Sequence, residues 1–183
     1  MSALFTRARL IGLAFAAFLF AIDQWVKAHV IETLNLRSVG QVELLPFFDL
    51  AYVENRGISL GLLQAHNMEM RWLLVALTAL IALVVFVWLM RERKLADILG
   101  LAMILGGALG NIVDRYTLGY VIDYADFHIG TFRPFLVFNI ADAAITIGVV
   151  IILVRSLFFS EKDEDTDTDG AAAGTVPAEN NNA

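Results

Sequence analysis

Residues 72–90 have the sequence WLLVALTALIALVVFVWLM, a long apolar run without a charged side chain. A helix needs about 20 predominantly apolar residues to cross the hydrocarbon core of a bilayer. The run ends at a charged turn, RERK, at residues 91–94. This stretch predicts a transmembrane helix and places the chain among membrane proteins.

Three more apolar runs accompany it, at about residues 10–31, 95–113 and 135–159. The composition agrees, because 58% of the 183 residues are hydrophobic, whereas a soluble domain has about 45–50%. Arg7 and Arg9 before the first run also resemble the start of a secretory signal peptide, but no A-x-A cleavage site follows. We therefore predict an uncleaved first helix and four transmembrane spans.

Two longer connections separate these spans. Residues 41–53 are rich in Val, Leu, Phe and Tyr and are interrupted by Pro46, which predicts one or two short strands. They lie in a β-rich insertion at about residues 33–70, and the second connection covers about residues 116–134. The fold class predicted is an all-α membrane protein of four transmembrane helices with a small extracytoplasmic β subdomain.

Basic residues in short loops predict the orientation, since cytoplasmic loops carry an excess of Lys and Arg. One side has the turn at residues 91–94 together with Arg7, Arg9, Arg155 and Lys162. On the other side, basic residues are spread over far longer loops, at Arg37, Arg56, Arg71, Arg115 and Arg133. This bias predicts that both termini are cytoplasmic and that the two longer connections lie outside.

Much of the net charge of −6 comes from residues 161–169. We predict a disordered acidic cytoplasmic tail at residues 161–183 after a membrane domain at residues 1–160. Asp165, Asp167 and Asp169 resemble the start of a calcium-binding loop, but Val176 stands where that loop needs a glutamate. The chain has no cysteine, which excludes disulfides, and no basic patch supports nucleic-acid binding.

Ionisable side chains within the spans are costly and need a reason. Asp23 and Lys27 are four residues apart in the first span, so they share a helix face. They could form a salt bridge near the interface with Lys27 extending outward, or they could support a nearby site. The sequence leaves both alternatives open.

The third span ends in GGALGNIVDR, residues 106–115. It is not a phosphate-binding loop, because no Lys-Ser/Thr pair follows. Gly106 and Gly110 have the small-xxx-small spacing that lets helices approach closely. Asn111 shares a helix face with Asp114 and with Arg115, which indicates a hydrogen-bond network of structural or functional purpose.

Asp142 is the most informative polar residue of the spans. If the fourth span begins near residue 135, Asp142 lies two turns inside it, about 10 Å from its outer end. Its neighbours are apolar apart from Asn139 and Thr146, and no basic residue of that span is near. We therefore expect Asp142 to face other protein groups, protonated or hydrogen-bonded.

A partner carboxylate is available in the second connection. Residues 120–128, YVIDYADFH, place Asp123 and Asp126 in an apolar-aromatic segment that could dip into the interface. Two carboxylates in one dry site separate their pKa values, so one stays protonated while the other ionises. Such a pair hydrolyses a peptide bond by acid–base chemistry without a metal or a covalent intermediate.

Three classes of protein remain open on these residues. They are an aspartic peptidase, a proton-coupled carrier with Asp142 as relay, and a non-catalytic membrane subunit with polar residues between its helices. His29, His66 and His128 form no zinc-binding pattern. Ser59 has no following helix pattern for a nucleophile. We predict neither a metal nor a cofactor, and we expect a monomer.

Five motifs in order resemble one family. They are DQWVK at 23–27, NRG at 55–57, GGALGNIVDR at 106–115, VIDYADF at 121–127 and FNIADAAI at 138–145. Together they resemble the lipoprotein signal peptidases, or signal peptidases II, of bacteria over about residues 10–157. Each motif is weak alone, but five in order among four spans are specific.

The resemblance implies an aspartic endopeptidase of the bacterial cytoplasmic membrane that cleaves diacylglyceryl-modified prolipoproteins just before the lipidated cysteine. It places the catalytic aspartates at Asp123 and Asp142. The supporting residues that it implies are Asp23, Lys27, Asn55, Gly57, Asn111, Asp114, Arg115 and Asn139. It also implies a sheet at about residues 41–61, contact with membrane lipids, and inhibition by globomycin.

One stretch departs from the family. After Asn-x-Gly the members commonly have Ala-Phe, whereas this chain has ISL at residues 58–60. Leu60 keeps an apolar side chain but lacks the aromatic ring. The departure concerns how that loop packs or meets lipid, and it leaves the expected chemistry unchanged.

Overall fold

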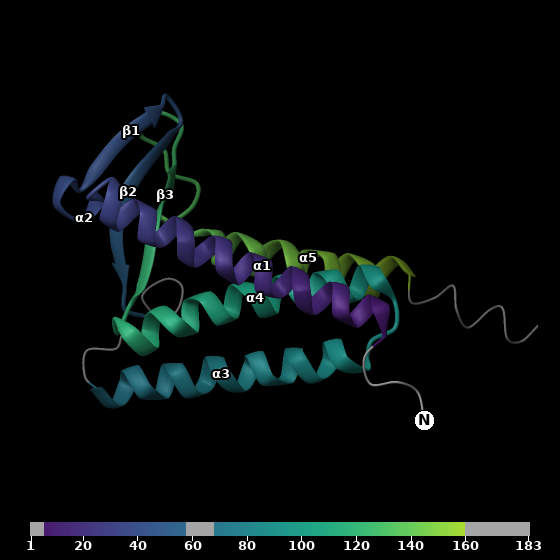
Figure 1. The fold of residues 1–183 in the computed structure, drawn as a ribbon. Coiled ribbons are helices and arrows are strands. Elements are labelled where there is room, and N and C mark those ends of the chain that lie inside the picture. Colours follow the sequence, from purple (N-terminus) through teal and green to yellow (C-terminus); the bar gives the residue numbers. More distant parts are fainter. Residues whose placement is uncertain (1–5, 58–67, 160–183) are drawn as a thin grey trace, which may run out of the picture.

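The computed structural model describes residues 6–57 and 68–159. Within these residues, four helices are long and apolar enough to cross a membrane, as predicted (Figure 1). They are α1 (Arg7–Ala28), which continues into a π-helical turn η1 (His29–Thr33), α3 (Met68–Arg91), α4 (Leu95–Thr117) and α5 (Ile140–Phe159). Ser59, Leu60, His66 and the acidic tail lie outside the described residues.

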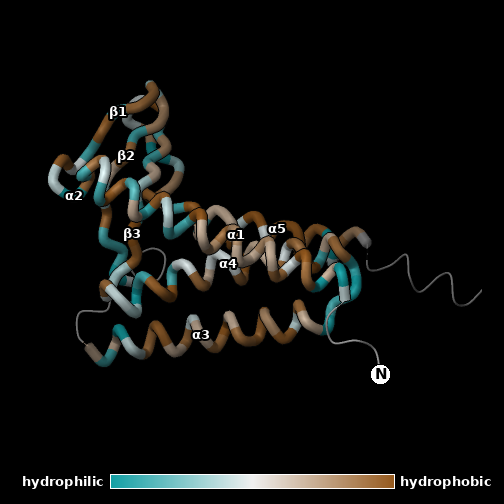
Figure 2. The backbone as a smooth tube through the Cα atoms, in the orientation of Figure 1, coloured by the Kyte–Doolittle hydropathy of each residue, from teal (hydrophilic) through white to brown (hydrophobic). Residues whose placement is uncertain are grey.

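The central helix of the bundle is α4, which packs against α1, α3 and α5. Half of the residues in the most apolar 18-residue segment of α4 are buried inside the protein. The corresponding share is 17–22% in the other three spans. Those spans turn large apolar side chains such as Phe18, Leu80 and Leu153 outward. The helices are hydrophobic along much of their length (Figure 2), and their exposed apolar side chains face outward, where lipid would surround them.

The contact between α1 and α4 depends on the glycines of α4. A Cβ at Gly106 would come within 2.6 Å of the carbonyl oxygen of Ala16 on α1. A Cβ at Gly110 would collide with the carboxylate of Asp23, which lies about two turns after Ala16 on α1. The predicted small-xxx-small packing is confirmed, because the backbones approach too closely for larger residues.

A three-stranded antiparallel sheet crosses the end of the bundle where α1 and α4 finish (Figure 1). Its strands are β1 (Gln41–Leu45), β2 (Phe48–Asn55) and β3 (Val121–Phe127), in that spatial order. A four-residue helix, α2 (Leu36–Val39), precedes β1, and Pro46 lies in the turn between β1 and β2. The strands predicted at residues 41–53 are confirmed, whereas the strand β3 was not predicted.

A second apolar cluster joins the sheet to the end of the first span. Val30 of η1 and Leu36 of α2 pack against Leu50 of β2 and against Ile122 and Tyr124 of β3. All five are buried. This cluster holds the sheet on the helices rather than leaving it as a separate unit.

The fourth span begins five residues later than predicted, at Ile140 instead of about residue 135. Phe138 is extended and pairs with Ala125, exchanging backbone hydrogen bonds of 2.8 and 3.0 Å with it. Hydropathy could not detect this, because an apolar residue is equally compatible with a buried strand and a helix. The third span ends at Thr117, and Asp114 and Arg115 lie in its last turns, as predicted.

Candidate active site

Asp142 lies in the first turn of α5 and not two turns inside a span, which corrects the prediction. Its backbone N–H donates to Asn139 Oδ1 at 2.8 Å, and its own Oδ2 accepts from the backbone N–H of Asn139 at 3.3 Å. These reciprocal bonds form a capping box. The spacing Asn-x-x-Asp was a sequence signal for this helix start.

Asp123 is provided by β3 and is almost completely buried, with 2% of its surface exposed. In the sheet, Val53 pairs with Asp123 and Asn55 pairs with Val121, so Asn55 and Asp123 are diagonal neighbours on one face. Asn55 Nδ2 donates to Asp123 Oδ2 at 3.0 Å. Asn139 Nδ2 donates to the other oxygen, Oδ1, at 2.7 Å. Both carboxylate oxygens therefore have an amide donor.

Asn111 of α4 connects the two aspartates. Its Nδ2 donates to Asp142 Oδ1 at 2.8 Å, while its Oδ1 accepts from Lys27 Nζ at 3.2 Å and from Asn139 Nδ2 at 3.3 Å. An ammonium is only a donor, so Lys27 requires the oxygen of this amide to face it. The amide nitrogen of Asn111 is thereby directed at Asp142.

Lys27 is buried and points into the protein, so the alternative in which it extends outward is wrong. Its Nζ lies 2.8 Å from Asp23 Oδ2 and 2.7 Å from Asp114 Oδ2, with side-chain exposures of 2%, 0% and 4% for the three residues. One ammonium thus lies between two buried carboxylates. Loss of one partner from such a cluster costs about 3–5 kcal/mol, because an uncompensated charge stays buried.

The same two carboxylates also hold the elements that carry the aspartate pair. Asp23 Oδ1 accepts from the backbone N–H of Ala141, in the first turn of α5, at 3.0 Å. Asp114 Oδ2 accepts from the backbone N–H of Ile122 on β3, at 3.3 Å. Asp23 therefore positions the helix of Asp142, and Asp114 positions the strand of Asp123.

Arg115 and Gly57 complete the network. Arg115 Nη2 donates to the carbonyl of Gly57 at 3.0 Å, and the N–H of Gly57 donates to Asn55 Oδ1 at 3.1 Å. The second bond directs the Asn55 amide nitrogen at Asp123. All ten residues proposed from the sequence are thus joined by continuous contacts, although they come from five elements and from two positions outside them, Gly57 and Asn139.

The burial of Asp123 raises its pKa to about 7, and the nearby charge of Asp142 adds to the rise. The hydrogen bonds from Asn55 and Asn139 oppose this effect. A carboxyl group with such a pKa is close to half-protonated at neutral pH. The site therefore pairs a carboxyl that can hold a proton with a second one at a helix N-terminus, where negative charge is favoured.

Sequence reasoning missed two residues that support this site. Gln24 Nε2 donates to Asp114 Oδ1 at 3.0 Å and to the carbonyl of Gly110 at 3.3 Å. Arg71 Nε donates to the carbonyl of Arg115 at 3.0 Å and so holds the end of α4. Gln24 lies inside the motif DQWVK, and this position could have marked it as a supporting residue. The sequence around Arg71 does not distinguish it from an ordinary basic residue of a loop.

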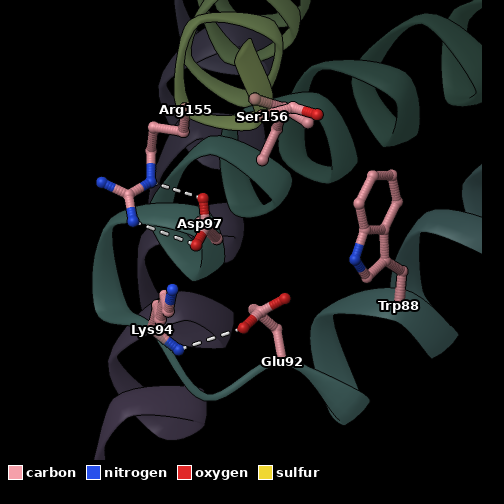
Figure 3. Close-up of a pocket in the computed structure, with 7 residues that line it drawn as sticks. Trp88, Glu92, Lys94, Asp97, Arg155 and Ser156 are labelled. Carbon is pink, nitrogen blue, oxygen red and sulfur yellow. Dashed lines mark hydrogen bonds and ion pairs between the residues drawn. The ribbon is translucent and has the colours of Figure 1, made fainter. Parts of the chain in front are cut away.

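A cavity of about 170 Å³ lies at the other end of α4, away from this network. There Arg155 of α5 donates to both carboxylate oxygens of Asp97 (Figure 3). The remaining lining residues are Trp88, Glu92, Lys94, Ile152 and Ser156. None of the ten network residues lines it. This ion pair fastens α5 to the beginning of α4 and has no contact with the aspartate pair.

Fold and site together define a class of protein. It is a polytopic membrane protein in which two carboxylates, one from a strand and one from a helix start, meet at one end of the bundle. Buried amides and one ion cluster hold both carboxylates in place.

Comparison with known proteins identifies the family. Residues 15–158 match the family described as signal peptidase (SPase) II. The lipoprotein signal peptidase of Sphingopyxis alaskensis is 51% identical over 85% of this chain and 90% of its own length. That of Rhizorhabdus wittichii is 50% identical over 84% of this chain and 89% of its own.

Solved structures agree with the fold. A bacterial membrane enzyme determined at 2.3 Å has a TM-score of 0.69 and 25% identity, over 91% of this chain and 94% of its own. A second, determined at 1.9 Å, has a TM-score of 0.68 and 27% identity, over 82% and 94%. The chain belongs to the signal peptidase II family. Of the three classes that the sequence left open, the peptidase is therefore correct, and the proton-coupled carrier and the non-catalytic subunit are excluded.

Proposed function

We propose that this chain removes signal peptides from diacylglyceryl-modified prolipoproteins, and that Asp123 and Asp142 are its catalytic pair. The observation that carries the assignment is the convergence of these two carboxylates from β3 and α5 on the shared amides of Asn111 and Asn139. The family and the names of the relatives support the reaction and its substrate.

The two aspartates take different protonation states in this proposal. Asp123 is buried and its pKa is raised to about 7, so below that pH it is the carboxyl that can hold the proton. Asp142 accepts hydrogen bonds on both oxygens in the first turn of α5, where the helix dipole favours a negative charge. Asp142 is therefore the base, and Asp123 is the acid.

The reaction follows from these states. Asp142 takes a proton from water as the water oxygen bonds to the scissile carbonyl carbon, and Asp123 gives its proton to the carbonyl oxygen. In the second step, Asp142 returns its proton to the leaving amine as the C–N bond breaks. Asp123 recovers a proton from the hydroxyl of the intermediate, which becomes the new carboxyl group. Both aspartates end in their starting states.

The place of the site suits a substrate anchored by lipid and a signal helix. Acyl chains buried between the spans contribute about 0.8 kcal/mol per CH₂, and the peptide bond stays near water at the interface. We place the chain in the bacterial cytoplasmic (inner) membrane with both termini in the cytoplasm and the site near the outer face. Globomycin would inhibit it by occupying the site, and one copy contains every residue of the network.

The remaining assignments divide the chain into a membrane domain at residues 1–160 and an acidic cytoplasmic tail at residues 161–183. Within the domain, Lys27, Asp23 and Asp114 position the catalytic elements. Asn55, Asn111 and Asn139 orient the carboxylates. Arg115 holds Gly57, two residues after β2, beside the site.

The test is cleavage of a diacylglyceryl-modified prolipoprotein by the purified protein. Asp123→Asn and Asp142→Asn should each lower kcat roughly 10²–10⁴-fold, because each removes one side of the acid–base pair. The matched control is Asp126→Asn. Asp126 is buried on the same strand, but it bonds to Arg133 instead of the network. This control should keep most of the activity of the folded protein.

Thermal unfolding of all three variants separates catalysis from folding. The two catalytic variants should unfold near the temperature of the parent protein, and globomycin should block cleavage by the parent. Substantial activity in either catalytic variant would refute the assignment. Unfolding of both variants would instead favour a purely structural role for the carboxylates.

A further inference from the structure

Large apolar side chains gather at the end of the sheet that lies farthest from α3 and α4. They are Leu44, Leu45, Phe47, Ile129 and Phe132, and we name this set the apolar tip. Each exposes between 48% and 65% of its surface. Figure 2 shows the hydrophobic colour at the turn between β1 and β2. A contiguous group of exposed large apolar side chains on a protein usually marks an interaction site.

The apolar tip is one surface made from two loops. The backbone N–H of His128 donates to the carbonyl of Phe47 at 3.0 Å, which joins the hairpin turn to the loop after β3. The rings of Phe47 and Phe127 pack with centroids 6.1 Å apart. Ile129 and Phe132 close the second loop through two backbone hydrogen bonds. The two loops of the tip are therefore joined to each other and to β3, the strand that carries Asp123.

The length of α5 places this tip relative to the bilayer. Its 20 residues span about 30 Å, the thickness of the hydrocarbon core, so Ile140 lies at the boundary. Phe138, two residues earlier, pairs with Ala125 of β3. Both ends of the loop between β3 and α5 are therefore level with the edge of the hydrocarbon. The strands cross the helix axes, so the tip extends sideways from the bundle at that level (Figure 1).

Two carboxylates next to the tip are buried and paired, whereas Glu43 and Arg133 at its border are exposed. Asp49 and Asp126 are cross-strand neighbours with 4% and 2% exposure. Asp126 accepts from Arg133 at 2.9 Å, and Asp49 accepts from Gln41 at 2.7 Å and lies 3.0 Å from His128 Nε2. The two inward carboxylates leave an apolar surface bordered by Glu43 and Arg133, a combination that suits the boundary between lipid tails and headgroups.

We propose that the apolar tip inserts into the outer boundary of the same bilayer that the four helices cross. The occupant of this surface is lipid, since the tip continues the lipid-facing surface of the spans at the level where α5 begins. The insertion would give the sheet a second attachment besides the cluster around Leu36. It would fix the height of Asp123 above the membrane. This inference does not depend on the catalytic assignment.

The absence of native cysteine makes the test direct. Leu45→Cys and Phe132→Cys, one from each loop, are labelled with an environment-sensitive fluorophore in the full chain reconstituted in lipid nanodiscs. Ser38→Cys on α2 is the matched control, because it is exposed on the same side of the molecule but outside the tip. Each label is quenched by lipids with a spin label near the headgroup and, separately, by aqueous iodide.

Both tip labels should be quenched by the spin-labelled lipids and should show iodide quenching several-fold weaker than the Ser38→Cys label. Tip labels as open to iodide as the control would overturn the proposal. Labels shielded from iodide but insensitive to the lipid quencher would also overturn it, since protein such as a second copy would then cover the tip. Two independent positions keep the test decisive if one variant fails to fold.

Discussion

At the scale of single residues, Lys27 determines the geometry of the site without touching the proposed reacting groups. Its ammonium neutralises two buried carboxylates and orients the amide of Asn111 toward Asp142. The sequence predicted that Asp23 and Lys27 share a face. It could not predict that both face inward, because Asp114, the partner that makes this favourable, lies 87 residues further along the chain.

The pKa of Asp123 predicts how activity depends on pH. The ordinary Asp pKa is about 3.9, and the folded protein raises that of Asp123 to about 7. Between these values the folded chain holds a proton that the unfolded chain has lost, so the free energy of unfolding falls as pH rises through this window. As pH rises above about 7, Asp123 loses its acidic proton, and kcat should fall.

Asn55→Ala tests the cause of this pH dependence. The hydrogen bond from Asn55 lowers the pKa of Asp123, so its removal should move the descending limb of the pH–rate profile to higher pH. The measurement is kcat against pH for the parent and the variant. A limb that stays in place or moves to lower pH would assign it to another group.

At the scale of elements, the start of α5 is decided by partners that are distant in sequence. Asn139 and Asp142 cap each other, Asp23 accepts from Ala141, and Phe138 is drawn into pairing with β3. Hydropathy detects that a span is present, because the bilayer requires about 20 apolar residues. It does not detect where an apolar segment changes from extended to helical, since that depends on hydrogen-bond partners.

The contact between α1 and α4 yields a prediction for Gly110→Ala. The added methyl group meets the Asp23 carboxylate, which must move away from Lys27. Overpacking of this kind costs about 1–3 kcal/mol, so both thermal stability in detergent and kcat/KM should fall. Leu109→Ala, at the neighbouring exposed position of the same helix, is the control and should change both far less. Equal effects of the two substitutions would contradict the packing argument.

At the scale of the whole molecule, the ten network residues come together at the end of the bundle where the sheet lies. The strands β1 and β2 come from the first third of the sequence and β3 and α5 from its last third, and α4 packs against α5 and contacts β3 (Figure 1). The Arg155–Asp97 pair fastens the other end of α4 and α5. The helices α4 and α5 are therefore joined by polar contacts at both ends.

The proposed orientation is tested with single cysteines in intact cells. Ser38→Cys, beside the sheet, should react with a membrane-impermeant maleimide from outside. Arg93→Cys, in the turn between α3 and α4, should react only after the membrane is permeabilised, because basic turns stay in the cytoplasm. The reverse pattern would place the site on the cytoplasmic side.

The sequence by itself determined the four spans, the strands around Pro46 and the family, because hydropathy and motif order are local properties of the chain. The ten candidate residues were also identifiable in this way. Tertiary structure decided that Asp123 lies on a strand, that Asp142 begins a helix, and that Lys27 points inward. The physical reason is that burial and hydrogen bonding depend on groups brought together from distant positions. Burial and hydrogen bonding therefore cannot be predicted from the periodicity of a single segment.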